Sequence, residues 1–471
     1  MSRSAVGAFL RQQEERIIEE LCAFARIPSV STDPAYGRHM GDAVDFVAAL
    51  MRGAGLEHVA VIATGGHPAI YADWLHAEGA PTILVYGHYD VQPPDPIAAW
   101  TSPPFEPVRR GERLYGRGVS DNKGPMLIPL KVAEAFMQSS GRLPLNVKFI
   151  IEGEEEVGSK HLEASLHEHR AMLAADFVLS ADGARWRADL PAVNLASRGI
   201  LVLEASLKTA ATDLHSGRFG GTIANPLHLM ARLVASLHDT DGRVAVTGFY
   251  DGVRAPTRAE REAVAAVPFD EDAYLAATGA SALVGEAGWT TLERNWLRPT
   301  LDLNGMWGGY QGAGSKTSIP SEAHAKISCR LVPGQEPAQI AAAIGRHLEM
   351  HCPPGGTVSM RWDGHGARAY EMPADHPCLA VTEQVLTEIH GTAPLRVRIG
   401  ATLPVSEMFL RILGIDTLLF SFSTADEGFH GPNEFFRLQG LRDGLAAWAR
   451  SWEILGTQKA ELYTPFRRAP R

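Results

Sequence analysis

The sequence predicts an α/β fold in two domains, with a mixed sheet flanked by helices in the larger domain and a smaller α/β domain inserted into it. The chain has 471 residues, 45% of them apolar, and is too long for one compact domain. In both terminal parts, short β-rich runs alternate with helical segments, whereas the middle part contains strands of strictly alternating polarity. We therefore expect residues 1–197 and 370–471 to form the larger domain and residues 198–369 the inserted one.

The first part of the larger domain should begin with an amphipathic helix that ends before Pro28 and continue with a helix over residues 42–54. Another apolar helix is expected over residues 125–136. Strands are expected at residues 58–62, 82–86, 146–151 and 177–180. This alternation of helices and strands is typical of α/β sheets.

The inserted domain is predicted to be a β-α-β-α set. Its strands are expected at residues 200–207 and 323–332, and its helices at residues 226–237 and 335–350. In the second strand, Ala325, Ile327, Cys329 and Leu331 share one face, which should be buried. The pattern of residues 239–299 predicts no particular conformation.

The pattern of the larger domain resumes after about residue 370. A helix is expected over residues 377–389 and strands at residues 396–399 and 417–420. A final helix carries Leu438, Leu441, Leu445, Trp448 and Trp452 at spacings of three and four.

Charge and cysteine content exclude several classes of protein. Lys and Arg total 44 against 54 Asp and Glu, without a basic block, so nucleic acid is not an expected partner. The four cysteines show no C-x-x-C spacing and indicate buried thiols in a reducing compartment. The N-terminal segment is charged throughout and no run approaches 18 apolar residues, so a soluble cytoplasmic protein without membrane contact is expected.

A histidine and an acid follow the apolar run that ends at Tyr86. If the extended backbone continues, the period of two places His88 and Asp90 on the same side. The pair is typical of a metal ligand with its supporting carboxylate, although a solvated strand end would carry the same residues. The metal is favoured because further acids and histidines follow other apolar strands.

Six such residues flank apolar strands. They are His88, Asp121, Glu155, Glu156, Asp182 and His430. In open α/β sheets, ligands bind beyond the carboxyl ends of the strands. Without cations, carboxylates so close together would raise one another's pKa and cost stability. Mixed histidine and carboxylate ligands suit zinc, manganese or cobalt better than calcium or magnesium. Two ions about 3.5 to 4 Å apart, bridged by one carboxylate, would use five ligands and leave one acid as a general base.

Four motifs resemble those of the co-catalytic zinc peptidases, the family of acetylornithine deacetylase, succinyl-diaminopimelate desuccinylase, aminoacylase and carnosine dipeptidase. The motifs are G-H-Y-D-V-Q-P, G-R-G-V-S-D-N-K-G-P, E-G-E-E-E-V-G-S and D-L-H-S-G-R-F-G-G, which begin at residues 87, 116, 152 and 213. The resemblance extends over nearly the whole chain. The long second domain, with residues 314–320 and 327–333, is most similar to the cytosolic carnosine-type dipeptidase branch.

The resemblance implies a role for each residue of the cluster. Asp121 would bridge two Zn²⁺ ions, or Mn²⁺ or Co²⁺, and a cis peptide would join it to Asn122. His88 and Asp182 would complete the coordination of one ion, and Glu156 and His430 that of the other. Glu155 would be the general base. Asp90 would orient the His88 ring.

In the inserted domain, the resemblance implies a lid that also pairs two copies of the chain. Residues matching positions that bind the substrate carboxylate or the oxyanion are His215, Thr317, Arg330 and His365. His215 and Thr317 would reach the partner's active site. Near Gly400 the family has two glycines and a serine before Ile-Pro, whereas this chain has Ala401 and Thr402 before Leu-Pro, which keeps a hydroxyl but adds bulk.

The implied activity is hydrolysis of the amide bond of dipeptides or short peptides with a free C-terminal carboxylate. An N-acyl-amino-acid deacylase would use the same metals. A metal-dependent binding protein without catalysis would not need Glu155. No G-x-S-x-G elbow occurs, which disfavours a serine hydrolase, and the G-S-K-T order near residue 317 does not match a phosphate loop.

Single residues also have simpler interpretations. Glu154, Glu155 and Glu156 could form a solvated helix start, where acids favour the positive end of the dipole. Arg330 could be a surface arginine on the polar face of its strand. His215 could cap a turn, given the small polar residues around it.

Overall fold

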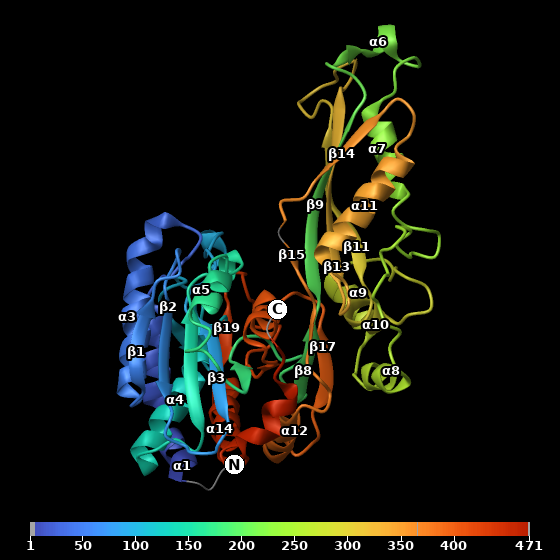
Figure 1. Ribbon diagram of the computed structural model, residues 1–471. Helices are drawn as coiled ribbons and strands as arrows, with labels where there is room; N and C mark the ends of the chain where they lie inside the picture. The colour runs from blue at the N-terminus through green and yellow to red at the C-terminus, as the bar shows by residue number, and fades with distance from the viewer. Residues whose placement is uncertain (1–4, 365, 470–471) are drawn as a thin grey trace. The chain divides into compact units, whose positions relative to one another are not determined.

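The computed structural model describes residues 5–364 and 366–469 and divides into two compact units. The first comprises the described residues up to Leu195, together with Met372–Val397 and the residues from Met408 onward. The second comprises Ala196–Glu371 and Arg398–Glu407. The fold is mixed α/β, which confirms the predicted class (Figure 1).

Residues 398–407 cluster with the second unit, although we predicted them as part of the larger domain. Polar contacts within the unit explain this difference. Arg398 pairs with Glu371 at 2.5 Å, and Arg198 donates its backbone N–H and its Nε to the carbonyls of Ala401 and Gly400 at 3.0 and 2.7 Å. Such contacts between distant segments leave no trace in hydrophobic periodicity.

Most strands of a nine-stranded sheet belong to the first unit, and only the terminal strand β16 lies wholly in the second. The path of the sheet is β1-β2-β6-β3-β7-β18-β8-β16, and β17 pairs with β8. Its strands are β1 (Glu57–Ile62), β2 (Ala69–Trp74), β3 (Thr82–His88), β6 (Asn146–Glu152), β7 (Phe177–Ser180), β8 (Ala192–Ser197), β16 (Tyr370–Glu371), β17 (Leu395–Ile399) and β18 (Thr417–Leu419). Strands β6, β3, β7 and β18 are parallel, whereas β1 and β2 are antiparallel, so the sheet is mixed as predicted.

The register of the parallel strands brings their carboxyl ends to one edge. His88 pairs with Glu152, Tyr86 with Ser180, and Ser180 with Leu419. The residues that follow these strands therefore meet at the same place. This edge is where the predicted ligands lie.

Helices pack around this sheet and against one another. They are α1 (Ala5–Gln12), α2 (Glu14–Ala25), α3 (Gly37–Gly53), α4 (Lys123–Ser140), α5 (Leu162–Glu168), α12 (Pro377–His390) and α14 (Leu438–Leu455). α3 lies beside β1 and β2, whereas the largely buried α4 packs on β3 and against α14 (Figure 1). The single N-terminal helix that we predicted is interrupted at Gln13, which has non-helical backbone angles.

A small antiparallel sheet joins two loops that matter for the site. It consists of β4 (Val108–Arg110), β5 (Arg113–Tyr115) and β19 (Phe435–Arg437). Phe435 pairs with Tyr115, so the residues before Phe435 lie next to the residues after Tyr115. His430 and Asp121 are thereby brought together across more than 300 residues of chain.

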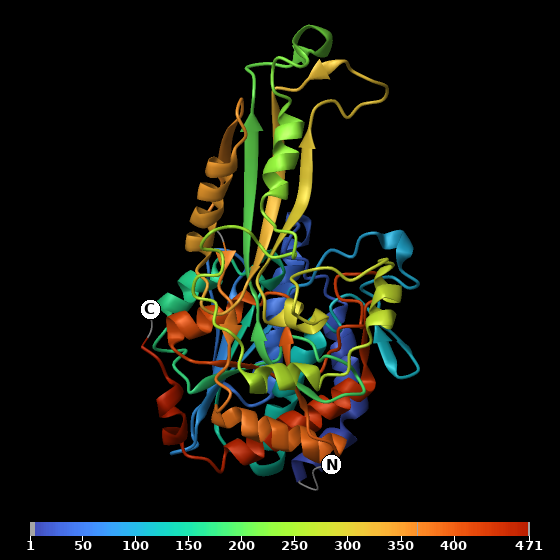
Figure 2. The same ribbon diagram turned by 90° about the vertical axis from the view of Figure 1, so that its right-hand side faces the viewer.

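The second unit contains an antiparallel sheet in the order β11-β13-β9-β14, with β15 also paired to β9. These strands are β9 (Gly199–Lys208), β11 (Thr300–Gly308), β13 (Glu322–Leu331), β14 (Thr357–Arg361) and β15 (Gly366–Ala367). Figure 2 shows α7 (Pro226–Ala235) and α11 (Pro337–His351) on the same face of this sheet. The predicted apolar face of β13 is buried on this side, with Ala325, Ile327, Cys329 and Leu331 each 0% exposed.

Residues 239–299, whose pattern predicts no conformation, form three short helices: α8 (Arg258–Ala265), α9 (Glu271–Thr278) and α10 (Thr291–Trp296). A capping box starts α8, in which Thr257 accepts from the Glu260 N–H and the Glu260 carboxylate accepts from the Thr257 N–H. Thr290 and Glu293 repeat the arrangement at α10. The T-x-x-E spacing is the sequence signal that would have located both helix starts.

The remaining short elements are η1 (Pro34–Tyr36), η2 (Ile97–Ala99), η3 (Glu155–Val157), α6 (Ser216–Phe219), β10 (Leu214–His215), β12 (Ser318–Ile319), α13 (Pro404–Met408), η4 (Phe409–Leu413) and η5 (Ala460–Phe466). Among the residues that the structure describes, no helix has the length and apolar character needed to cross a bilayer.

Candidate metal centre

His88, the last residue of β3, is fully buried and held in one orientation. Its Nδ1 lies 3.1 Å from the backbone oxygen of Asp90 and 3.3 Å from the Asp90 carboxylate. With the Nδ1 proton donated there, the Nε2 lone pair is available to a metal. Nε2 points to Asp121 Oδ1 at 3.2 Å and to Asp182 Oδ1 at 3.9 Å.

His430 and Glu156 form the other half of the site. His430 Nε2 lies 3.2 Å from Asp121 Oδ2 and 3.2 Å from Glu156 Oε2. Within each half, one ligand atom from every residue lies within 4.8 Å of the others. Because one Asp121 oxygen faces His88 and the other faces His430, this carboxylate belongs to both halves.

Asp90 has two structural roles, of which sequence reasoning found one. Besides its contact with His88, its carboxylate accepts the backbone N–H groups of Glu155 and Glu156 at 3.3 and 3.1 Å. Gln92 Nε2 donates to the Glu156 carboxylate at 2.8 Å. The buried Asp90 therefore connects the end of β3 to the turn that carries both glutamates.

The peptide bond between Asp121 and Asn122 is cis, as the resemblance implies. The Asn122 side chain donates to the backbone oxygen of Ala181 at 3.2 Å and to Asp182 Oδ1 at 3.4 Å. Asn122 thus links the loop of one ligand to the loop of another.

Glu434 is a positioning residue that sequence reasoning missed. Its fully buried carboxylate accepts the backbone N–H groups of Gly118, Ser120 and Asp121 at 2.8, 2.9 and 3.1 Å, and Arg117 Nη1 donates to it at 2.7 Å. This one carboxylate therefore fixes the backbone of the Asp121 loop. The G-P-N-E stretch carries Glu434, but only the pairing of β19 with β5 shows which loop it meets.

The protein groups of the site are strongly perturbed by one another. Burial raises the pKa of Glu155 well above its usual range; His88 opposes this shift, and the charge of Asp182 adds to it. Burial also raises the pKa of Asp182 to about 6. Hydrogen bonds to its two carboxylate partners raise the pKa of His430 to about 10. Several carboxylates and two imidazoles crowded together fit a site built to hold cations.

The second unit brings the predicted substrate residues together in two separate pairs. Arg330 Nη1 donates to Thr402 Oγ1 at 2.7 Å. His215 lies beside the strand that follows Thr317, because β10 pairs with β12 and the Ser216 N–H donates to the Thr317 carbonyl at 3.0 Å. His215 Nδ1 accepts the Gly217 N–H at 3.0 Å, as a turn cap does. His365 lies outside the described residues.

The two pairs lie toward opposite ends of β13. Thr317 precedes the strand at Glu322, and Arg330 is next to its last residue. At about 3.3 Å per residue, the strand separates Glu322 from Arg330 by roughly 26 Å. One copy of the chain therefore does not bring both pairs to the same small substrate.

Residues 84–453 match peptidase family M20/M25/M40. The chain is 31% identical over 393 residues to the Beta-Ala-His dipeptidase of Homo sapiens, and the alignment covers 81% of this chain and 76% of that protein. It is 27% identical over 446 residues to the Cys-Gly metallodipeptidase DUG1 of Candida albicans, over 90% of this chain and 91% of that one. The crystal structure of the M20 family metallo-carboxypeptidase Sso-CP2 from Sulfolobus solfataricus superposes with a TM-score of 0.82 at 28% identity, over 94% of this chain and 99% of that one.

Proposed function

Since the chain belongs to peptidase family M20/M25/M40, we propose that this metallopeptidase hydrolyses the amide bond of dipeptides or short peptides that end in a free carboxylate. One observation carries the proposal: two groups of ligands share Asp121 beside Glu155. The names of the relatives favour the same substrate class, because the human one is a Beta-Ala-His dipeptidase and the Candida albicans one a Cys-Gly metallodipeptidase.

The residues would hold two Zn²⁺ ions per chain, with Mn²⁺ or Co²⁺ as alternatives. His88 and Asp182 would bind one ion, Glu156 and His430 the other, and Asp121 both. The donor set fits, since two imidazoles with carboxylates suit these metals, and the His88 Nδ1 contact to Asp90 leaves Nε2 free to bind. When bound, the ions would supply the Lewis acidity that activates water and polarises the scissile carbonyl.

Glu155 would act as the general base and then as the general acid. It would take a proton from the attacking water and deliver it to the leaving amine. Burial raises the pKa of this carboxylate, which makes it a stronger base than an exposed glutamate. The Asp90 carboxylate accepts the backbone N–H of Glu155 and also contacts the His88 ring, so the same residue positions the base and this histidine.

Arg330 would bind the C-terminal carboxylate of the substrate. A guanidinium recognises a carboxylate through charge and paired N–H donors, which favours short peptides over internal bonds of long chains. The Thr402 hydroxyl already accepts from Arg330 Nη1 and would share the pocket. Because Thr402 is bulkier than serine, the range of C-terminal residues should be narrower here than the family pattern implies.

His215 and Thr317 would serve the active site of a second copy of the chain, in a homodimer formed through the inserted domain. The separation along β13 supports this, because the two pairs of substrate residues lie too far apart to contact the same dipeptide. In the partner's site His215 would stabilise the oxyanion.

We also propose a cytoplasmic location, which agrees with the free thiols of all four cysteines.

A panel of dipeptides and N-acyl-amino acids tests the proposed substrate class. Protein stripped of metal is refilled with Zn²⁺, Mn²⁺ or Co²⁺, and release of free amino acids is measured for each compound. The proposal expects dipeptides to have the highest kcat/KM. Preferential cleavage of the acyl-amino acids would assign an N-acyl-amino-acid deacylase, and no cleavage of either class in any metal would favour a binding protein.

A further inference from the structure

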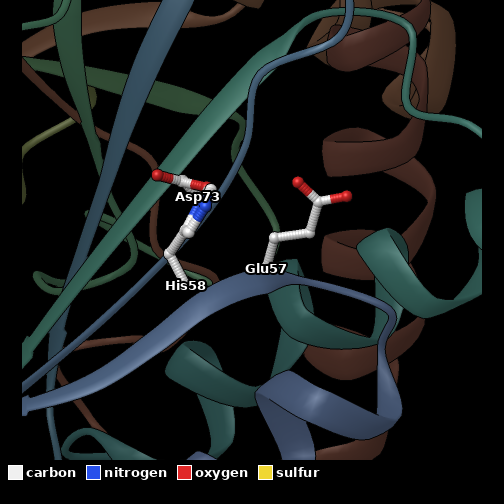
Figure 3. Close-up of side chains that lie close together, drawn as sticks. All are labelled: Glu57, His58 and Asp73. Carbon is white, nitrogen blue, oxygen red and sulfur yellow. The ribbon is translucent and has the colours of Figure 1, made fainter.

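A second cluster of imidazole and carboxylate groups lies at the outer edge of the large sheet. It consists of Glu57, His58, Asp73 and His76, from β1, β2 and the residues just after β2. One ligand atom from each of the first three lies within 4.8 Å of the others (Figure 3). Strands β2 and β6 separate β1 from β3, which carries His88, so this cluster is distinct from the centre described above.

An irregularity in β1 places two neighbouring ligands together. Glu57 pairs with Asp73 and Ala60 with Tyr71, so three steps along β1 match two along β2. In a regular strand, Glu57 and His58 would point to opposite faces. The extra residue, with His58 at φ 50°, re-aims the side chain, as bulges at sheet edges do. In Figure 3 both side chains extend from the same side of β1.

Asp73 is the fixed point of the cluster. It is only 5% exposed, and Tyr71 Oη donates to its Oδ2 at 2.7 Å, which leaves Oδ1 to face His58 Nδ1 at 2.8 Å. Lys148 pairs with Asp73 across the strands, but its Nζ donates to the backbone oxygens of Met172 and Ala174 at 2.6 and 2.7 Å. The hydrogen bond from Tyr71 Oη orients the Asp73 carboxylate, as supporting residues orient the ligands of metal sites.

Glu57 is the third group of the cluster, and His76 contacts its carboxylate. His76 Nε2 lies 2.9 Å from Glu57 Oε2, and its ring stands edge-on to Trp74 at 5.1 Å. Both side chains are about half exposed, with 45% of Glu57 and 59% of His76 accessible, so an ion can enter from solvent. Glu57, His58 and Asp73 thus offer one imidazole nitrogen and two carboxylates to an ion, and His76 contacts the Glu57 carboxylate. Zinc is also bound by three protein ligands with water in the fourth position.

We propose that Glu57, His58 and Asp73, with His76 in contact with Glu57, form a peripheral binding site for a zinc-type divalent cation. Two isolated ion pairs on the surface would contribute little to stability. Three donors that converge from two strands can bind one ion together, because the ion neutralises both carboxylates and accepts the lone pair of the neutral His58 imidazole. Calcium and magnesium, which prefer oxygen alone, should not occupy the site.

Zinc stoichiometry of the 471-residue protein tests the site. Parent and His58→Asn proteins are equilibrated with buffered free zinc over a concentration series, and bound metal is counted by atomic emission. Asparagine tolerates the positive φ at this position, so the backbone should persist. The parent is expected to bind one zinc more than His58→Asn, and also one more than Glu57→Gln. With Co²⁺, the same difference should appear in the visible absorption spectrum.

His39→Asn is the matched control, because His39 Nδ1 lies 3.3 Å from Asp42 Oδ2 in another exposed histidine and acid pair. It should bind as much zinc as the parent. Equal zinc in the parent and His58→Asn, or an equal loss in His39→Asn, would overturn the proposal. The comparison counts metal and not turnover, so it holds whether or not the chain cleaves dipeptides.

Discussion

At the residue scale, the two oxygens of Asp121 face two different histidines, at 3.2 Å each. Asp121→Ala should therefore lose both metal ions, whereas Asp182→Ala, which removes a ligand from one half only, should lose one. Metal content after gel filtration measures this difference. An Asp121→Ala protein that keeps one tightly bound ion and its activity would show that Asp121 is not a bridge.

Glu155 differs from its neighbour Glu156 in function although both follow the same strand. Glu155→Gln keeps the shape of the side chain but does not take a proton, so kcat should fall roughly 10²- to 10⁴-fold while the metal content stays unchanged. Glu156→Gln is the matched comparison and should reduce the metal content as well. A kcat of Glu155→Gln within tenfold of the parent would place the base elsewhere.

Glu434 touches no proposed ligand side chain but fixes the backbone of the Asp121 loop through three N–H groups. Glu434→Gln keeps one acceptor oxygen and loses the charge that faces Arg117. We expect zinc affinity about 10- to 100-fold lower, as for other supporting partners of metal ligands. Glu293→Gln is the control, because Glu293 is also buried and accepts from an arginine, Arg261, and from the backbone N–H of Thr290, but lies in the second unit. Competition with a chelator measures the affinity, and an equal loss in both variants would contradict a specific role of Glu434.

At the element scale, strands with a clear pattern were predictable and strands without one were not. The alternation of β13 predicted its buried face residue by residue, and the apolar run before His88 predicted β3. β2 was missed because all six of its residues are buried, and Ala69, Ala72 and Asp73 are poor strand formers. The conformation of β2 is determined by its pairing with β1 and β6, and these long-range contacts are not visible in the local sequence pattern.

The same reasoning explains which site residues could be found. His88 and Asp182 follow recognisable strands, and the parallel register then brings them to one edge. His430 precedes a three-residue strand, so its place beside Asp121 depends on the pairing of β19 with β5. The strand pattern already included His430 among the candidate residues, and the resemblance to the zinc peptidases assigned its role, whereas neither indicated Glu434.

The start of α12 provides a prediction on pH and stability. Burial lowers the pKa of His376 to about 4, while its Nδ1 accepts the Cys378 N–H as a helix cap. In the unfolded chain this histidine titrates near pH 6.5, so the unfolded state binds more protons between about pH 6.5 and 4. Stability contributed by the neutral ring is complete above about pH 6.5 and is lost as the pH falls toward 4.

His376→Asn keeps a capping acceptor and removes the titrating ring. The free energy of unfolding of this variant should therefore fall less steeply between about pH 6.5 and 4 than that of the parent. Urea unfolding at a series of pH values, with a chelator in every sample so that metal loss does not contribute, measures both slopes. Parallel slopes for the two proteins would show that His376 does not carry this dependence.

At the scale of the whole molecule, the second unit holds two pairs of proposed substrate residues separated by roughly 26 Å of β13. Each pair would then serve a different active site, one in its own chain and one in the partner. A two-fold dimer with such shared sites has no activity as a monomer, because each site lacks its His215. Turnover should therefore depend on protein concentration in the range where the dimer dissociates.

Mixing two inactive variants tests this arrangement directly. His215→Ala and Glu155→Gln should each be inactive as homodimers, since every site would lack one of the two residues. In a heterodimer, one site combines Glu155 of one chain with His215 of the other, and activity should reappear at up to half the parent level per heterodimer. Subunit exchange is followed with two affinity tags, and a mixture of Glu155→Gln with Asp121→Ala is the control that should stay inactive, because both changes lie in the same unit. A second mixture combines His215→Ala with a Glu155→Gln and Asp121→Ala double variant. It should recover activity as well as the first mixture does, because the site of the His215→Ala chain keeps Glu155 and Asp121 and receives His215 from the double variant. Exchange without any recovered activity would place His215 in the site of its own chain.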